Sequence, residues 1–132
     1  MTQQTISTTS ARRDTILVVD DNPDVCRLMR IVLSKKYNLL EASSATAALE
    51  LTTRHQPQLV LLDIMMTGEM DGLKVLDAIK SDPALKDVIV GMVTACGQDA
   101  DRLDARIRGA NAYFVKPFSP LEVVTWVNSQ LQ

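Results

Sequence analysis

The run ILVVDDN, residues 16–22, places four apolar residues directly before two aspartates. Two later apolar runs end in the same way, LVLL at Asp63 and YFV at Lys116. Uninterrupted runs of this kind are typical of strands that are buried on both faces of a parallel sheet. In an open α/β sheet, ligands bind beyond the carboxyl ends of the strands. The pattern therefore predicts one pocket formed by Asp20, Asp21, Asp63 and Lys116.

The charges of this predicted pocket indicate its chemistry. Three carboxylates at close range repel one another, so together they favour a divalent cation. The lysine opposite them favours an anion. A metal ion, an anion and a carboxylate nucleophile are the components of phosphoryl transfer.

Composition bounds the class of protein. A chain of 132 residues is long enough for one domain with a substantial core. Its net charge of −2 gives no reason to expect direct binding to nucleic acid or to an anionic membrane. No run of ~18 apolar residues is present to span a bilayer. Residues 1–13 lack the apolar centre of a signal peptide, so we predict a disordered tail at 1–13 and one domain at 14–131.

The two cysteines, Cys26 and Cys96, are far apart and form no CxxC motif. This usage favours free thiols in a reducing compartment, and hence a cytoplasmic location. The single histidine, His55, has no companion at metal-ligand spacing, so a solvated or capping role is expected.

Strand and helix patterns alternate about five times, which is typical of an α/β fold with a parallel sheet. Predicted strands cover 15–20, 37–42, 58–63, 88–94 and 112–115. Predicted helices cover 23–34, 44–55, a segment after Asp71, 98–108 and a segment after Ser119. Asn22 and Asp71 are expected to cap helices at their N-termini, and Gly109 to end one.

Four motifs in order resemble the receiver domain of two-component response regulators: ILVVDDN at 16–22, LLDIMMTGEMDG at 61–72, VTA at 93–95 and GANAYFVKPF at 109–118. The resemblance extends over residues 14–131. It implies an α/β, flavodoxin-like five-stranded parallel sheet of order 2-1-3-4-5 with five flanking helices. The switch point of this sheet lies between its first and third strands.

The resemblance also implies roles at the predicted pocket. Asp63 resembles the phosphoacceptor, and Lys116 the lysine that pairs with a phosphoryl oxygen, with a cis peptide bond to Pro117. The implied cofactor is Mg²⁺, or Mn²⁺ in its place, and its implied ligands are Asp20, Asp21, Asp63 and the backbone carbonyl of Met65. The plainer alternatives are helix-capping aspartates and a surface lysine.

Thr94 and Tyr113 resemble a switch pair. A hydroxyl at the end of the fourth strand can turn toward a new phosphoryl group, and the space that it leaves admits the tyrosine ring. The alternatives are an ordinary strand-end threonine and an ordinary half-buried aromatic residue. The loop after Asp63 departs from the family, which usually has proline at the position of Thr67 and one residue fewer, with Glu69 as the apparent insertion.

The last predicted helix carries Trp126, the single tryptophan. Helical spacing places Leu121, Val124 and Leu131 on the core side, Val127 on its flank and Trp126 nearly opposite. Trp126 is then either an exposed interface anchor or a ring that lies across neighbouring side chains. The fourth helix, the fifth strand and the fifth helix together resemble the face that such domains use for partners or for dimers.

The leading prediction is a phosphorylation-controlled switch that takes its phosphoryl group from a histidine kinase or a phosphotransfer protein. It would catalyse only its own phosphorylation and dephosphorylation, and would act on a downstream target, a C-terminal output domain or, as a homodimer, on a second copy. Whether the chain is a single-domain regulator or a piece of a longer protein stays open.

Three other classes of protein are alternatives to a phosphorylated receiver. A phosphatase of the haloacid dehalogenase type needs an aspartate where Met65 stands, and a flavodoxin needs a phosphate loop where residues 20–23 place carboxylates. A degenerate receiver would bind partners without being phosphorylated.

Overall fold

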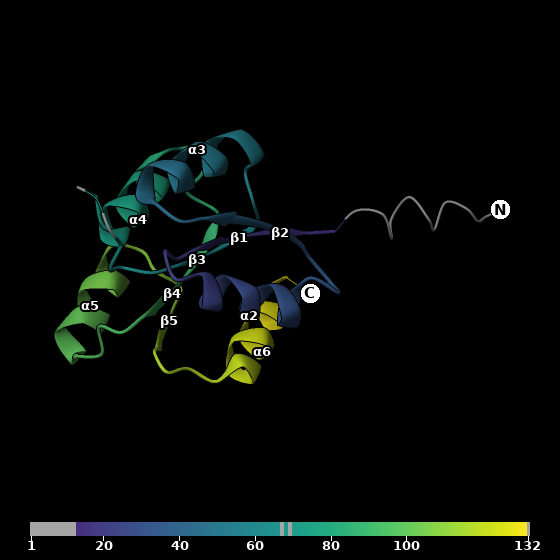
Figure 1. The fold of residues 1–132 in the computed structure, drawn as a ribbon. Coiled ribbons are helices and arrows are strands. Elements are labelled where there is room, and N and C mark those ends of the chain that lie inside the picture. Colours follow the sequence, from purple (N-terminus) through teal and green to yellow (C-terminus); the bar gives the residue numbers. More distant parts are fainter. Residues whose placement is uncertain (1–12, 67, 69, 132) are drawn as a thin grey trace.

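The computed structural model describes residues 13–66, 68 and 70–131. Strands and helices alternate along the chain, as predicted (Figure 1). The strands are β1 (Thr15–Val19), β2 (Asn38–Ala42), β3 (Leu59–Leu62), β4 (Ile89–Thr94) and β5 (Ala112–Val115). The helices are α2 (Pro23–Leu33), α3 (Ala45–His55), α4 (Gly72–Ser81), α5 (Asp99–Ile107) and α6 (Pro120–Leu131). These bounds differ from the predicted ones only at the ends of elements.

The five strands form one parallel sheet of order β2-β1-β3-β4-β5, which confirms the predicted flavodoxin-like topology. The register places Val19, the last residue of β1, beside both Ala42 and Leu62. The carboxyl ends of β1 and β3 are therefore level, and the residues that follow them emerge together at the switch point.

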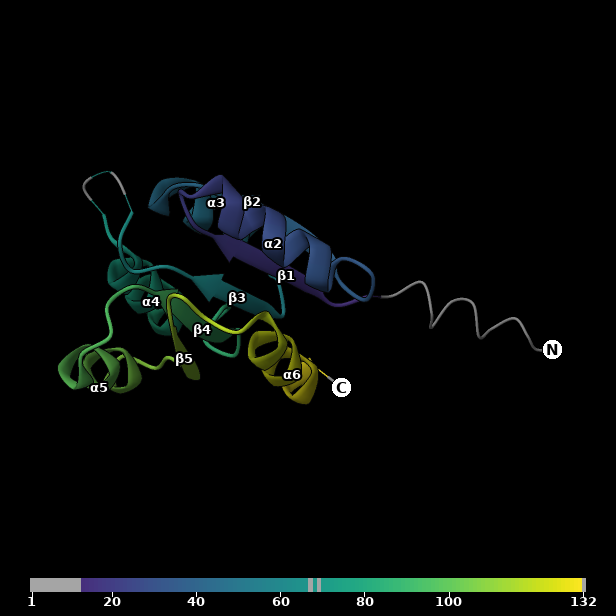
Figure 2. The same ribbon diagram turned by 60° about the horizontal axis from the view of Figure 1, so that its bottom comes forward.

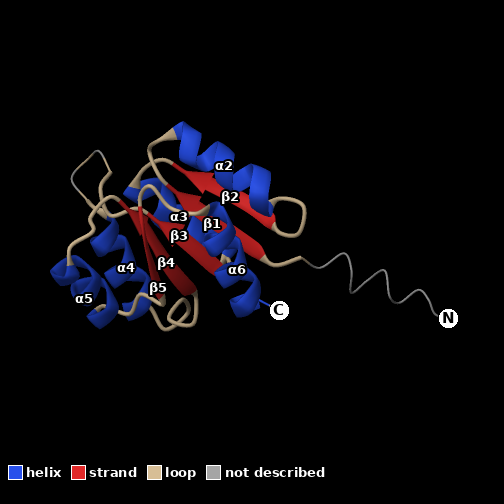
Figure 3. Ribbon diagram, turned by 90° about the horizontal axis from the view of Figure 1, so that it is seen from below, coloured by secondary structure: helices blue, strands red, loops and turns tan. Residues whose placement is uncertain are grey.

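Helices cover both faces of the sheet: α3, α4 and α5 pack on one face, and α2 and α6 on the other (Figure 3). Successive side chains of a strand point to opposite faces, so β1 sends Leu17 and Val19 toward the first group and Ile16 and Val18 toward the second. Because both faces are covered, the strands need the uninterrupted apolar runs that the sequence shows.

Side-chain caps begin the helices that flank the switch point. The Oδ1 atom of Asn22 accepts a hydrogen bond from the backbone N–H of Asp24 at 2.9 Å, as predicted for the start of α2. Asp71 accepts in the same way from the backbone N–H of Lys74 at 3.1 Å, at the start of α4. Gly109 follows α5 with a φ of +110°, which favours glycine.

Arg13, the last residue of the predicted N-terminal tail, contacts the folded domain. Its guanidinium donates hydrogen bonds to the backbone carbonyls of Ser34 at 2.9 Å and Lys36 at 3.1 Å, beyond the end of α2. Arg13 is therefore part of the folded domain, since it satisfies carbonyls that the helix end leaves without partners. Residues 1–12, where the rest of the predicted tail falls, lie outside the described residues.

The prediction of which side of α6 faces the core is wrong. Val123 and Val127 are fully buried, whereas Leu121 is 73% exposed. Val124 and Leu131 are only partly buried against the same core cluster. Trp126 is half-buried, and its ring meets that of Phe114 edge to face, with the centroids 5.7 Å apart. Of the two alternatives for Trp126, the structure shows the ring that packs on its neighbours.

No helix among the described residues combines the length and the apolar character that crossing a bilayer requires.

Candidate functional site

Three carboxylates gather at the switch point of the sheet. Asp20 and Asp21 follow β1, and Asp63 follows β3. Each offers one oxygen to a group in which all three oxygens lie within 4.8 Å of one another. Asp20 and Asp63 are buried, whereas Asp21 is exposed at the mouth of the site. Burial limits the screening of their mutual repulsion by water, so the cluster strongly favours a positive partner.

Lys116 supplies one positive charge to this cluster from the end of β5. Its Nζ atom lies 2.7 Å from Oδ2 of Asp20 and 3.0 Å from Oδ2 of Asp63. Burial by itself would lower the pKa of Lys116, but the hydrogen bonds to the two aspartates outweigh it and the pKa is raised. The Lys116–Pro117 peptide bond is cis, as expected. One ammonium against three carboxylates leaves a net negative charge, which suits a divalent cation.

The backbone holds the other oxygen of each buried carboxylate. Oδ1 of Asp20 accepts a hydrogen bond from the N–H of Asn22 at 2.9 Å, and Oδ1 of Asp63 accepts one from the N–H of Met65 at 3.2 Å. Because each carboxylate is held at both oxygens, its orientation is set before any ligand binds. The side chain of Met65 is 63% exposed beside the site.

The start of α4 packs directly against the backbone of Asp63. The N–H of Gly72 donates to the carbonyl of Ile64 at 2.8 Å. A Cβ at position 72 would lie 1.9 Å from the carbonyl oxygen of Asp63, a distance that no side chain tolerates. The sequence motif contains Gly72, but its steric reason appears only in the structure.

Thr94 and Tyr113 meet at the backbone of Cys96. Thr94 is buried at the end of β4, and its Oγ1 atom accepts a hydrogen bond from the N–H of Cys96 at 3.3 Å. The hydroxyl of Tyr113 donates to the carbonyl oxygen of the same residue at 2.5 Å. Burial, as the largest cause, raises the pKa of Tyr113 to about 12. The prediction for Cys96 concerned its thiol, whereas Thr94 and Tyr113 contact its backbone.

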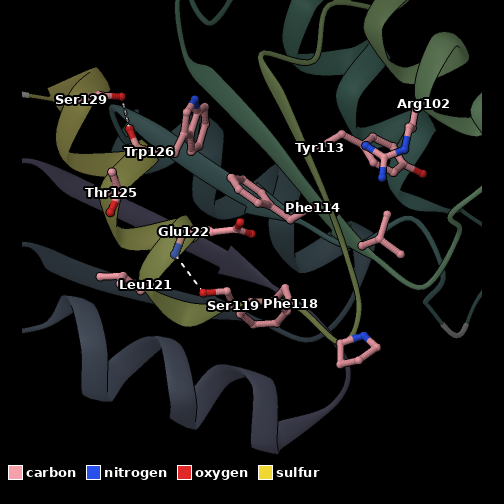
Figure 4. Close-up of a pocket in the computed structure, with 12 residues that line it drawn as sticks. Arg102, Tyr113, Phe114, Phe118, Ser119, Leu121, Glu122, Thr125, Trp126 and Ser129 are labelled. Carbon is pink, nitrogen blue, oxygen red and sulfur yellow. Dashed lines mark hydrogen bonds between the residues drawn. The ribbon is translucent and has the colours of Figure 1, made fainter.

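One hollow of the described surface is lined by none of the three carboxylates. It is a groove of about 760 Å³ between β5 and α6, which we call the aromatic groove (Figure 4). Its principal lining residues are Phe114, Phe118, Leu121, Trp126, Arg102 and Glu122. Tyr113 lines the same groove, so the residue that touches Cys96 is also part of this surface.

The aromatic groove belongs to the face formed by α5, β5 and α6. Figure 2 shows β5 between the two helices, as does the view from below. Leu103 and Ile107 of α5 and Leu121 of α6 are the exposed large apolar residues on these helices. The predictions for Thr67 and Glu69 concern the loop beside the metal cluster and lie outside the described residues.

Comparison with known proteins places this fold and site in a family. Residues 16–128 match the family model of the response regulator receiver domain. The transcriptional regulatory protein SrrA of Staphylococcus aureus (strain NCTC 8325 / PS 47) is 36% identical over 118 residues, which are 89% of this chain and 47% of SrrA. The chain thus spans about half the length of the curated relatives that it matches. The chain belongs to the response regulator receiver domain family, the signalling module of two-component systems.

Solved structures agree with this assignment. A protein described as a response regulator of Chloroflexus aurantiacus J-10-fl superposes with a TM-score of 0.84 at 30% identity, over 91% of this chain and 98% of that one. The Mn²⁺-bound form of response regulator Rcp1 superposes with a TM-score of 0.74 at 25% identity, over 88% of this chain and 90% of that one.

Proposed function

We propose that Asp63 accepts a phosphoryl group from a phosphohistidine on a histidine kinase or a phosphotransfer protein. The observation that carries the proposal is the position of Lys116, which bridges the buried carboxylates of Asp20 and Asp63. An ammonium held there is ready to pair with the oxygens of an incoming phosphoryl group. Phosphoryl transfer depends mostly on position and charge neutralisation, which suits a weak carboxylate nucleophile.

The transfer exchanges one bond for another. A carboxylate oxygen of Asp63 bonds to phosphorus while the bond from phosphorus to the histidine nitrogen breaks, and the bonding electron pair stays with the imidazole. Hydrolysis of the aspartyl phosphate would return Asp63 to its free form, with water as the attacking group. The domain would therefore act as a catalyst only on itself, and its role would be that of a signal carrier.

Asp20, Asp21 and Asp63 would hold the divalent cation, together with the backbone carbonyl of Met65. Their oxygens are hard donors, and the carboxylate oxygens lie within 4.8 Å of one another, which fits Mg²⁺ or Mn²⁺. When bound, the cation would neutralise negative charge on the phosphoryl oxygens. The relative Rcp1 has a Mn²⁺-bound form, which supports the same donor chemistry here.

Thr94 and Tyr113 would carry the signal away from Asp63. A hydroxyl can accept one hydrogen bond and donate another, so Thr94 could keep the N–H of Cys96 and donate to a phosphoryl oxygen. Tyr113, bound to the other side of the same residue, would then respond at the face formed by α5, β5 and α6. That face would bind a downstream protein, a C-terminal output domain or a second copy, in the cytoplasm.

Intact-mass measurement after incubation with acetyl phosphate and Mg²⁺ tests the proposal. We expect a gain of ~80 Da, one phosphoryl group, in the wild type and none in Asp63→Asn. Hydroxylamine should remove the adduct, because an acyl phosphate reacts with this nucleophile. No adduct in the wild type, and no stabilisation by beryllofluoride, would instead favour a degenerate receiver that binds partners without phosphorylation.

A further inference from the structure

Arg102 of α5 lies over the aromatic face of Tyr113. Its guanidinium carbon is 5.4 Å from the ring centroid, and Figure 4 shows the two side chains stacked beside the aromatic groove. A guanidinium within ~6 Å of a ring centroid is attracted by the negative face of the ring. The hydroxyl of the same tyrosine donates to the carbonyl of Cys96. Tyr113 is therefore held in two places, on its face by a cation and at its tip by the backbone.

This contact joins α5 to the end of β4. All residues of α5 are described, and Ala105 alone among them is buried, so the helix has little apolar anchorage. Arg102 connects it to Tyr113, Tyr113 connects to the carbonyl of Cys96, and the N–H of Cys96 connects to Thr94. A continuous set of contacts thus runs from an exposed arginine to the buried threonine at the carboxyl end of β4.

We propose that Arg102 is a positioning residue that holds Tyr113 against Cys96 before a phosphoryl group arrives. The proposal rests on the proposed function of Thr94 and Tyr113 as a switch. Arg102 raises the population of the Tyr113 position seen here in the unphosphorylated protein. A ligand that selects this position then binds more tightly, because less of its binding free energy goes into moving the ring.

The expected size follows from the strength of such contacts. A cation over a half-buried ring changes a two-state population by about two- to fivefold. The Tyr113 ring is half-buried and Arg102 is exposed, so the effect belongs in this range and should not be larger. Arg102 would thus adjust the population of this Tyr113 position, whereas Thr94 and the phosphoryl group would cause the switch itself.

The chain offers a matched control. Arg106 follows one turn later on α5 and is also exposed. With Arg102 and Tyr113 it lines a second hollow of the described surface. The stacked contact with Tyr113 is made by Arg102. Replacing either arginine by alanine removes the same charge from the same helix face, so a difference between the two variants reports the stack itself.

Fluorine NMR of the protein labelled with 3-fluorotyrosine tests the proposal. The chain has two tyrosines, so two resonances are expected, and Tyr37→Phe assigns them. We would compare the wild type with Arg102→Ala, Arg102→Lys and Arg106→Ala, first without ligand and then during titration with beryllofluoride and Mg²⁺. Thermal unfolding of each variant would check that the fold is retained.

We expect Arg102→Ala to move the Tyr113 resonance away from its beryllofluoride-bound position and to raise the half-saturating concentration about two- to fivefold. Arg102→Lys should recover part of both effects, since it keeps a cation, and Arg106→Ala should show neither. Identical spectra and half-saturation for Arg102→Ala and Arg106→Ala would overturn the proposal.

Failure of the underlying function would look different. In that case beryllofluoride would leave the Tyr113 resonance of the wild type unchanged. The ligand-free spectra would still decide whether Arg102 positions the ring, because that comparison needs no phosphoryl mimic.

Discussion

The six-membered ring of Trp126 lies over Gly91, in space that any larger residue of β4 would need. A Cβ built on Gly91 would be 2.7 Å from Cζ3 and 2.9 Å from Cη2 of the indole. The glycine therefore lets a large residue of α6 approach the sheet backbone closely, and the edge-to-face contact with Phe114 holds the ring there. The contact between Gly91 and Trp126 therefore fixes the position of α6 on the sheet. Trp126 also lines the aromatic groove, so the same contact shapes that groove.

Gly91→Ala should destabilise the domain, because the methyl group meets the indole at less than contact distance. Overpacking of this kind costs about 1–3 kcal/mol in the free energy of unfolding, which urea denaturation would measure. Trp126→Leu combined with Gly91→Ala should recover part of the loss, since the smaller side chain leaves room for the methyl group. Additive effects of the two substitutions would contradict the proposed contact.

The sequence alone was sufficient to predict the parallel sheet and the carboxylate cluster. Asp20, Asp21, Asp63 and Lys116 each stand at the end of an apolar run, and parallel order brings such ends to one edge. Those features are local, so a pattern of neighbouring residues reveals them. The caps at Asn22 and Asp71 are local in the same sense, since each is closed by a backbone N–H only a few residues away.

The buried side of α6 could not be predicted from a pattern of neighbouring residues. Its apolar residues occur on several sides of the helix, so helical spacing alone does not choose between Leu121 and Val127. The choice depends on Gly91, which lies on another element and leaves a gap that the ring of Trp126 fills. The hydrogen bonds of Arg13 and the stacking of Arg102 on Tyr113 also join residues of different segments. The sequence alone does not show which residue an arginine contacts.

Gly72→Ala should damage both stability and phosphorylation. Its Cβ would strike the carbonyl oxygen of Asp63, a backbone atom that cannot rotate away, so the start of α4 or the loop after β3 must move. We expect a loss of about 3 kcal/mol or more in unfolding free energy, together with slower modification by acetyl phosphate. Gly97→Ala is the control, because the atom nearest to its Cβ would be a side-chain carbon of Val115, at 3.1 Å, and the nearest backbone atom, the carbonyl oxygen of Ala95, would be at an ordinary contact distance of 3.9 Å. Wild-type phosphorylation of Gly72→Ala would contradict the steric account.

Stability should fall at high pH through Lys116 and Tyr113. The pKa of Lys116 is raised above its ordinary ~10.4. Its contribution is therefore complete below ~10.4 and is lost as the pH rises through the folded-state pKa. Tyr113, with a pKa of about 12 against an ordinary value of 10.0, acts in the same direction between those two values.

Urea denaturation between pH 8 and pH 12 would measure this dependence. Lys116→Met should be less stable at neutral pH by about 3–5 kcal/mol, since it leaves Asp20 and Asp63 without their cation, and should show a flatter alkaline slope. Tyr113→Phe should flatten only the upper part of the range. An unchanged slope in Lys116→Met would show that other groups cause the alkaline loss.

A divalent cation should stabilise the domain, and Asp21 should be needed for this effect. At a Mg²⁺ concentration ten times its dissociation constant, binding adds about 1.4 kcal/mol to the unfolding free energy. Asp21→Asn should be more stable than the wild type in EDTA, because it relieves repulsion within the cluster, and should gain less from Mg²⁺. Thermal unfolding in EDTA and in Mg²⁺ would give both quantities. An equal gain from Mg²⁺ in the two proteins would place the ion elsewhere.

Two substitutions in α6 should separate its core side from its groove side. Val127 is fully buried in the core cluster that α6 shares with α2 and the sheet, so Val127→Ala should cost about 1–3 kcal/mol through lost burial and a cavity. Leu121 is 73% exposed at the aromatic groove, so Leu121→Ala should stay within about 0.5 kcal/mol of the wild type. Urea denaturation of the two variants side by side makes the comparison. A larger loss of stability in Leu121→Ala than in Val127→Ala would mean that α6 buries the side that helical spacing predicts. In that case the ring of Trp126 would not pack on Gly91.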